Sequence, residues 1–262
     1  MDFKTLITSE QNGIFTVTLN RPEKRNAISY DLIQDLLRAL GQAERSACHV
    51  LLITGSGKAF CAGMDLENLK ALSAANKSHA EHVEDSRMMA RLFRAIYDFP
   101  KPSIAAVNGA AIAGGTGIAT LCDITIAVPE AKFGYTEVRI GFVPAIVSTF
   151  LMRQIGEKQA RDLLLTGRLI DAAEAYRIGL INEVVAPENL MVRAHEIANL
   201  LMENSPASVR ATKALISRKL NADLDEQIEA AVEQNARMRL SDDFREGVAS
   251  FLEKRKPKWS GK

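Results

Sequence analysis

The chain has 262 residues, of which 47% are hydrophobic and 25% are charged, and its 33 Lys and Arg residues nearly balance its 32 Asp and Glu residues. This composition is typical of a globular protein, and the near-neutral charge argues against wholesale nucleic-acid binding. The length is that of one large domain, or of one domain with a small appendage.

The first predicted elements are strands. Residues 6–10 and 13–20 carry β-branched residues at alternating positions, and Asn12 and Gly13 between them are the residue types of a tight hairpin turn. A short apolar run at 49–55 predicts a third, buried strand. The chain therefore starts with an antiparallel pair of strands that leads into a buried sheet.

Helices are predicted between these strands and after them. Ser29 is placed to cap a helix over 31–40, whose apolar residues follow helical spacing and which Gly41 is expected to end. A second amphipathic helix is predicted over 81–98, where the prolines of the FPKP segment stop it.

The order of strand, turn and helix then repeats. A strand at 103–109 is followed by the glycine-rich run AIAGGTGIAT at 111–120 and by another strand at 122–128. From about residue 148 the pattern is helical, apart from one strand at 180–186. We expect an α/β core followed by a helical region.

One helix near the C-terminus carries an apolar face at Leu224, Ile228, Ala231 and Val232. Such a face must be buried, either on the core or on another subunit. No linker rich in proline or glycine separates this region from the core.

The cysteines and the hydropathy of the chain predict its cellular location. Cys48, Cys61 and Cys122 are odd in number and show no CxxC spacing. The start, MDFKTLITSE, has no features of a cleavable signal, and no apolar run reaches the roughly 18 residues that cross a membrane. We expect free thiols, a cytoplasmic location and no membrane partner.

Common nucleotide and metal motifs are incomplete. The run at 111–120 lacks the last glycine of GxGxxG, and in GSGKAF Ala59 replaces the Ser or Thr of a phosphate-binding loop. His79 and His82 are three residues apart, but no other ligand cluster surrounds them, and we interpret them as a solvated helix start. No metal is predicted.

Two segments have the same predicted order of elements. LLITGSGKAFCAGMDL and SIAAVNGAAIAGGTGIA each run from a strand through small residues into the start of a helix. Backbone N–H groups at a helix start have no intrahelical partner, and the helix dipole adds positive potential there. If the two turns lie side by side, two N–H groups can converge on one oxygen and form an oxyanion hole. The alternative is that the small residues only permit close packing of helix on sheet.

In these and other segments the chain resembles a known family, the crotonase superfamily, which is also called the enoyl-CoA hydratase/isomerase family. The matching segments occur in the family's order and cover nearly the whole chain. They are LNRPEKRNAIS, ITGSGKAFCAGMDL, KPSIAAVNGAAIAGGTGIATLCDITIA, AKFGYTEVRIGFVP, LLLTGRLIDAAEAYRIGLINEVV and FLEKRKPKW.

The resemblance implies an α/β fold, with a crotonase-like repeated ββα core and a C-terminal helical region. It implies an acyl-CoA-binding core at residues 1–200 and a helical trimerisation or lid region at 201–262. It further implies acyl-CoA thioester substrates and a homo-trimer, or a hexamer made of two trimers. Coenzyme A is part of the substrate, no other cofactor is expected, and neither nucleic acid nor a membrane is an expected partner.

The resemblance also implies catalytic positions. The backbone N–H groups of Met64 and Gly114 would hold the enolate that forms at the thioester carbonyl. Glu137, in the FGYTEV segment, would be the acid/base, and its apolar neighbours predict partial burial and a raised pKa. The best-known hydratases of the family carry a second glutamate after the glycine run, where this chain has Gly117.

Substrate-binding residues are implied in the same way. Arg25 matches the segment that the family uses near the adenine and pantetheine, and the basic run at 254–258 could meet a 3′-phosphate or remain a solvated tail. Asp65 is also placed to cap the helix that follows it. The expected substrate- and coenzyme-binding residues are Arg25, Ala62, Asp65, Leu66 and Gly115.

Three functions are compatible with these residues. The main hypothesis is hydration of a 2-enoyl-CoA to a 3-hydroxyacyl-CoA with Glu137 as the acid/base, and the run TEVRIGFVPAIVS looks most like hydratases of branched-chain acyl-CoA breakdown. The first alternative is isomerisation of a 3-enoyl-CoA to a 2-enoyl-CoA, which needs one base. The second is an acyl-CoA-binding protein with little catalysis. Ala145 stands where related dehalogenases place their nucleophilic aspartate, which excludes that chemistry.

Overall fold

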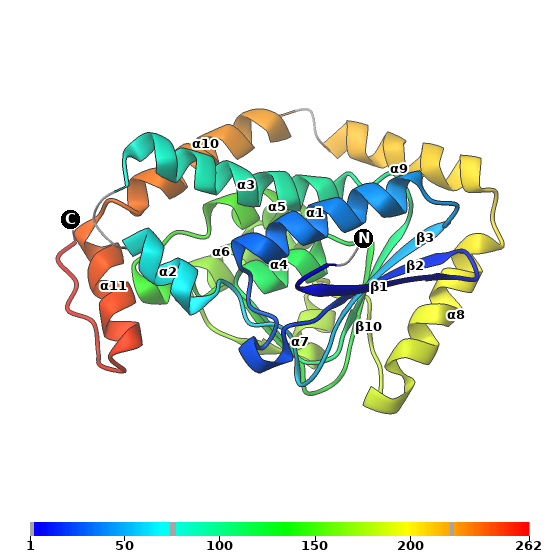
Figure 1. Cartoon of the computed structure of the whole chain (residues 1–262), viewed down its shortest axis with the longest axis horizontal. Helices are drawn as coiled ribbons and strands as arrows, with labels where there is room; N and C mark the ends of the chain where they lie inside the picture. Colours follow the sequence, from blue (N-terminus) through cyan, green and yellow to red (C-terminus); the bar gives the residue numbers. More distant parts are fainter. Residues whose placement is uncertain (1–2, 74–76, 221–222, 262) are drawn as a thin grey trace.

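The computed structural model describes residues 3–73, 77–220 and 223–261, which form an α/β protein with two sheets (Figure 1). Met1 and Asp2, the first residues of the segment MDFKTLITSE, lie outside the described residues. The strands are β1 (Leu6–Gln11), β2 (Ile14–Leu19), β3 (Val50–Gly55), β4 (Ala59–Cys61), β5 (Ser103–Val107), β6 (Ala110–Ile112), β7 (Ile124–Ala127), β8 (Lys132–Gly134), β9 (Ile170–Asp171) and β10 (Glu183–Val184).

The helices follow the same chain order. The α-helices are α1 (Tyr30–Arg45), α2 (Leu66–Ser73), α3 (His79–Tyr97), α4 (Gly114–Thr120), α5 (Ala145–Ile155), α6 (Glu157–Thr166), α7 (Ala172–Arg177), α8 (Leu190–Met202), α9 (Pro206–Leu220), α10 (Leu224–Met238) and α11 (Asp242–Leu252). Short 3-10 helices are η1 (Pro22–Lys24), η2 (Glu137–Ile140) and η3 (Pro187–Asn189). The predicted α/β class with a helical C-terminal region is confirmed.

The larger sheet has the strand order β1-β2-β3-β5-β7-β10. β1 and β2 pair antiparallel, and the other neighbours pair parallel. Asn12 and Gly13 adopt the positive φ angles, 49° and 77°, that a tight hairpin turn requires, so the predicted hairpin is confirmed. The strand predicted over 180–186 is shorter, because only Glu183–Val184 pairs with β7.

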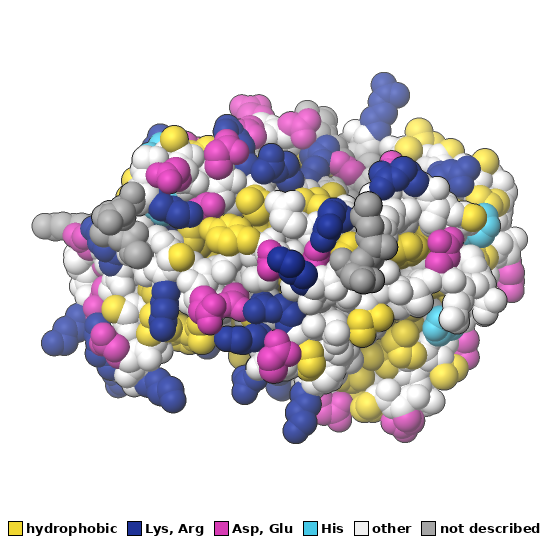
Figure 2. Space-filling model, in the orientation of Figure 1, with side chains coloured by type: hydrophobic (Ala, Val, Ile, Leu, Met, Phe, Trp, Pro, Cys, Tyr) yellow, Lys and Arg dark blue, Asp and Glu magenta, His cyan; other side chains and the backbone are white. Residues whose placement is uncertain are grey.

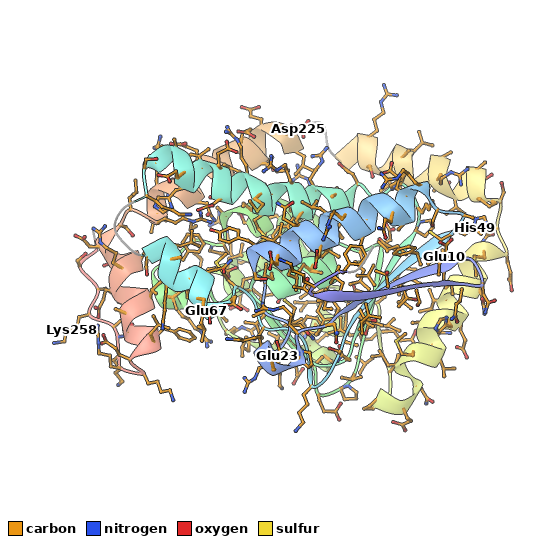
Figure 3. All side chains as sticks on the ribbon, in the orientation of Figure 1. Glu10, Glu23, His49, Glu67, Asp225 and Lys258 are labelled. Carbon is orange, nitrogen blue, oxygen red and sulfur yellow. The ribbon has the colours of Figure 1, made fainter. Side chains whose placement is uncertain are left out.

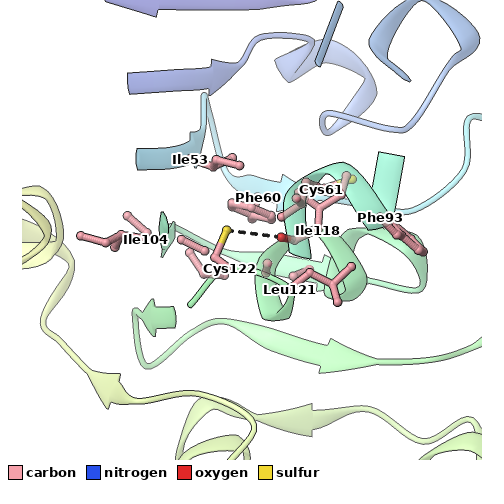
Figure 4. Packing of buried hydrophobic residues seen from close by; sticks show 14 of the residues in the cluster. Ile53, Phe60, Cys61, Phe93, Ile104, Ile118, Leu121 and Cys122 are labelled. Carbon is pink, nitrogen blue, oxygen red and sulfur yellow. Dashed lines mark hydrogen bonds between the residues drawn. The ribbon is translucent and has the colours of Figure 1, made fainter. Parts of the chain in front are cut away.

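The smaller sheet, β4-β6-β8-β9, is absent from the prediction. Its strands have two or three residues each, which is too short for any alternation of apolar and polar residues to be visible. α4 contacts strands of both sheets, β5 and β7 of the larger and β4 and β6 of the smaller. Figure 4 shows side chains from β4, α3 and α4 packed together in this core.

α1 begins as predicted but ends later. The Ser29 hydroxyl accepts the N–H of Leu32 at 3.2 Å and so caps the helix. Gly41 was expected to end it, and that prediction is wrong, since α1 continues to Arg45. The extra turn buries Ala43 completely in the core, and this burial outweighs the poor helix propensity of one glycine.

The C-terminal helices differ in what they cover. α10 packs against α3 and α5 and buries its predicted apolar face, while α11 packs against α2 and η2. None of the described side chains of α9 is buried. Across the described ranges, no helix combines the length and the apolar character that a membrane crossing requires. Figure 2 shows cationic and anionic side chains interspersed on the visible face of the molecule.

Candidate active site

A cavity of about 500 Å³ lies among the two glycine-rich turns, η1, η2 and the helices α3, α5 and α10. All but one of the residues predicted for the site line this cavity. These are Arg25, Ala62, Met64, Asp65, Leu66, Gly114 and Glu137. Gly115 is buried elsewhere: a Cβ placed on it would lie 2.3 Å from the backbone oxygen of Cys61, so this glycine permits helix α4 to pack on β4.

The two glycine-rich turns lie side by side, because they follow the neighbouring parallel strands β4 and β6. A Cβ placed on Gly63 would lie 3.0 Å from the backbone oxygen of Ile112 and 3.3 Å from the Cβ of Ala113. The two turns therefore lie next to each other, as the oxyanion-hole hypothesis requires, and the convergence of their N–H groups stays a prediction.

Met64 and Gly114 each follow a residue with an unusual backbone. Gly63 has a φ of 86°, and Ala113 has a φ of 52° and a ψ of −122°. The second conformation is one that residues with a Cβ rarely adopt, at a cost of about 1 to 3 kcal/mol, and such strain clusters at functional sites. It sets the direction of the peptide group that carries the Gly114 N–H.

The N–H groups of Met64 and Gly114 are unpaired in the part of the chain that the structure describes. Their neighbours are paired: the Asp65 N–H donates to the oxygen of Ile28 at 2.9 Å, and the Ala113 N–H donates to the oxygen of Gly134 at 2.7 Å. Both residues are partly buried and line the cavity. Their two unpaired donors are thus available to a ligand oxygen.

Glu137 begins η2 and lines the same cavity. Its Oε2 is buried and has no hydrogen-bond partner within the described residues. Burial raises the pKa of this carboxyl to about 7, against the smaller lowering effect of its own backbone N–H. A carboxyl that titrates near neutral pH can both accept and return a proton, so the predicted partial burial and raised pKa are found together.

Gly117 does not reach the cavity, and its surroundings are apolar. A Cβ placed on it would lie 2.9 Å from the Cζ of Phe93 and 3.1 Å from the Cγ1 of Val147, and both of these side chains line the cavity. A glutamate at position 117 would enter the space that these two residues fill. The cavity wall is therefore apolar where a second acid would stand.

Two other carboxylates line the cavity and are placed differently. Asp65 accepts the Glu67 N–H at 2.9 Å, as the predicted helix cap, and the Arg21 guanidinium at 2.8 Å. Burial raises its pKa, but these hydrogen bonds and the Arg21 charge hold the pKa below its usual value. Glu23 is exposed on η1 (Figure 3). Neither is a buried carboxyl without a partner.

Charged side chains of both signs line one part of the cavity, since Lys24 and Arg25 follow Glu23 in the lining. Lys24 and Arg25 line it with exposed side chains, and the Nζ of Lys24 lies 3.5 Å from a carboxylate oxygen of Glu67. Arg25 ends η1 in the left-handed conformation, which directs the chain back toward the core. The position fits the expected coenzyme-binding role of this segment.

The basic run at 254–258 lies elsewhere. Arg255 forms an ion pair with Glu246 of α11, and the Lys258 N–H donates to Glu246 at 2.7 Å. Figure 3 places Lys258 beside α11, away from Glu23 on η1. In the single chain this run is an exposed segment held to α11.

The interpretation of His79 and His82 as a solvated helix start is wrong for one of them. The Nε2 of His79 lies 3.2 Å from a carboxylate oxygen of Glu233 and is partly exposed. His82 is only 2% exposed, because α10 packs across this part of α3. The spacing of the two histidines does not indicate that α10, which lies far along the chain, packs on them.

Known proteins resemble this chain in both sequence and fold. Residues 9–262 match the family model described as Enoyl-CoA hydratase/isomerase. The chain is 41% identical over 255 residues to a Thermus thermophilus protein whose name provisionally assigns it to the enoyl-CoA hydratases, covering 97% of this chain and 100% of that protein. It is 35% identical to a crotonyl-CoA hydratase of Syntrophomonas wolfei, with full coverage of both chains. A crystal structure of an enoyl-CoA hydratase from Mycobacterium avium superposes with a TM-score of 0.86 at 35% identity, covering 99% of this chain and 100% of that one.

Proposed function

Since the chain belongs to the enoyl-CoA hydratase/isomerase family, we propose that it adds water across the double bond of a 2-enoyl-CoA to give a 3-hydroxyacyl-CoA. The matches also confirm the crotonase-like α/β fold. The observation that carries the proposal is the buried, unpartnered Oε2 of Glu137 in the same cavity as two unpaired backbone N–H groups. Relatives named as hydratases favour hydration over isomerisation.

The proposed reaction begins at the thioester carbonyl. Its oxygen accepts the N–H groups of Met64 and Gly114, which polarises the conjugated double bond toward the carbonyl. These donors lie on rigid turns, so they are in place before negative charge develops on the oxygen. Loss of one such donor typically lowers kcat by about 100-fold to 1000-fold.

Glu137 then moves the proton. Its carboxylate takes a proton from water while the water oxygen bonds to C3, and the electron pair of the double bond moves to the thioester oxygen as an enolate. The protonated Glu137 returns the proton to C2, and the carbonyl forms again. Water, substrate and product balance, so this chemistry needs no cofactor beyond the coenzyme A that the substrate carries.

Purified protein incubated with two thioesters tests the reaction. With crotonyl-CoA, the ultraviolet absorbance of the conjugated thioester is expected to fall as water adds. With a 3-enoyl-CoA, an isomerase would instead raise that absorbance by creating conjugation. No change with crotonyl-CoA and a rise with the 3-enoyl-CoA would replace hydration by isomerisation, and no change with either would contradict both enzymatic functions.

We propose that the chain assembles into trimers, alone or paired as hexamers, through the surface that includes α9. This helix leaves large apolar side chains in water, since Leu215 is 68% exposed and Ile216 is 56% exposed. Exposed apolar surface of this kind marks protein contacts. The resemblance to a trimeric family supports the same assembly.

We propose a cytoplasmic location. The chain's cysteines, Cys48, Cys61 and Cys122, are all buried and unpaired. Free thiols without disulfides are usual in proteins of a reducing compartment, which supports this location.

A further inference from the structure

One wall of the cavity carries a buried cation. Arg239, which directly follows α10, lines the cavity, and its side chain is only 3% exposed. Asn235, one turn earlier on α10, lines the cavity as well and is also buried. The guanidinium lies 5.6 Å above the ring of Phe142. An apolar acyl chain that extended to this wall would contact the charge of Arg239 and the amide of Asn235 instead of hydrocarbon.

The guanidinium of Arg239 has an acidic neighbour. Its Nη1 lies 3.7 Å from a carboxylate oxygen of Asp85 and donates to the backbone oxygen of His82 at 3.3 Å. The same Asp85 oxygen lies 2.6 Å from the Nζ of Lys77. One carboxylate therefore lies within ion-pair distance of two cations. Burial and the charge of Arg239 lower the pKa of His82. Among the described residues, Arg239 thus shares its ion-pair partner with Lys77.

Two polar atoms at this place lack partners within the described residues. They are the Nε of Arg239, which lines the cavity, and the Nδ1 of the neighbouring His82. The amide nitrogen of Asn235 can donate two hydrogen bonds. Within the described residues it donates one, to the backbone oxygen of Val143 at 3.5 Å. Buried polar groups are normally paired, so a cluster with unused donors fits a ligand that brings acceptor oxygens.

We propose that this cluster selects acyl-CoA thioesters whose acyl chain ends in a carboxylate, and that Arg239 determines this specificity. The inference rests on the proposed function for the reaction but concerns the other end of the acyl chain. A carboxylate supplies a second anion, and its two oxygens match the planar donors of a guanidinium. The side chains of Met89, Phe93 and Val147, which line the cavity, would contact the intervening methylenes. A methyl end would leave the cation buried and the donors unpaired.

Calorimetric binding of saturated thioesters tests the selectivity without any turnover. Butanoyl-, pentanoyl- and hexanoyl-CoA are compared with succinyl-, glutaryl- and adipyl-CoA, which have the same carbon numbers and end in a carboxylate. At the best chain length, the carboxylate-ended thioester is expected to bind roughly 10-fold to 100-fold more tightly than its methyl-ended counterpart. Equal or weaker binding of the carboxylate-ended thioester at every length would overturn the proposal.

Variants assign the preference to the cluster. Arg239→Met, which keeps a similar length, is expected to abolish the preference, whereas Arg237→Met, an exposed arginine on the same helix, leaves it unchanged. A preference that survives Arg239→Met would overturn the assignment. If circular dichroism shows Arg239→Met to be unfolded, Asn235→Leu takes its place, with a reduced preference expected and an unchanged one contradicting the proposal. Absence of hydration together with an intact preference would contradict the proposed reaction and leave this selectivity standing.

Discussion

Glu137 differs from the other acidic residues of the cavity in its surroundings. Its buried oxygen has no cation and no donor beside it in the described part of the chain, whereas Asp65 holds both an arginine and a backbone N–H. The apolar neighbours of Glu137 in sequence predicted this burial. The apolar wall around Gly117 could not be predicted, because Phe93 and Val147 come from helices far apart in the chain.

The buried carboxyl of Glu137 makes stability depend on pH. Because its folded-state pKa of about 7 lies above the ordinary value of 4.5, its stabilising contribution is present below pH 4.5 and is lost as the pH rises through 7. Glu137→Gln removes this loss. The difference in free energy of unfolding between the variant and the wild type is therefore expected to be about 2 to 3 kcal/mol more favourable to the variant at pH 8 than at pH 5. Urea unfolding at both pH values measures it. A difference that stays constant with pH would contradict the burial of this charge.

At the scale of elements, the two glycine-rich turns form the site because they follow adjacent strands. The sequence predicted both turns and the chemistry that they would permit if they met. It did not predict β4 and β6 as a separate sheet, since a three-residue strand leaves no periodic pattern. The same limit applies to the positive φ of Ala113, which only the surrounding packing imposes.

Neighbouring glycines of α4 provide a matched pair of substitutions. Gly115→Ala would place a Cβ 2.3 Å from the rigid backbone of Cys61, so a loss of about 1 to 3 kcal/mol or more in the free energy of unfolding is expected. Gly114→Ala meets only the flexible end of Ile28, at 2.9 Å, and is expected to cost less than about 1 kcal/mol. Thermal and urea unfolding compare the two. Equal losses would show that α4 does not pack on β4 as described.

At the scale of the whole molecule, helices distant in sequence complete the cavity. α10 supplies Asn235, and Arg239 follows at its end, while Phe244 and Phe251 come from α11. Sequence reasoning predicted that the apolar face of α10 would be buried. It could not choose between the core and another subunit, because hydropathy shows that a face must be covered and does not identify its partner.

The exposed apolar residues of α9 test the proposed assembly. Ile216→Glu places a charge at the proposed subunit contact and is expected to convert trimers or hexamers into monomers at micromolar concentration, since a buried unpaired charge opposes association. Lys158→Glu, at an exposed polar position of α6, serves as the control and should keep the assembly. Sedimentation velocity measures the masses. A wild-type monomer, or an Ile216→Glu variant of unchanged mass, would contradict the role of α9.

In the proposed mechanism, Glu137 alone carries the proton in hydration. This role is tested most directly by the pH dependence of kcat/KM for crotonyl-CoA hydration in the wild type, in Glu137→Gln and in Glu130→Gln, a control at an exposed position. The wild type and the control should rise with pH and level off above about 7, as the carboxyl of Glu137 ionises. Glu137→Gln should be lower by about 100-fold to 10,000-fold and lack this ionisation. Activity of Glu137→Gln within a few fold of the wild type would contradict the account.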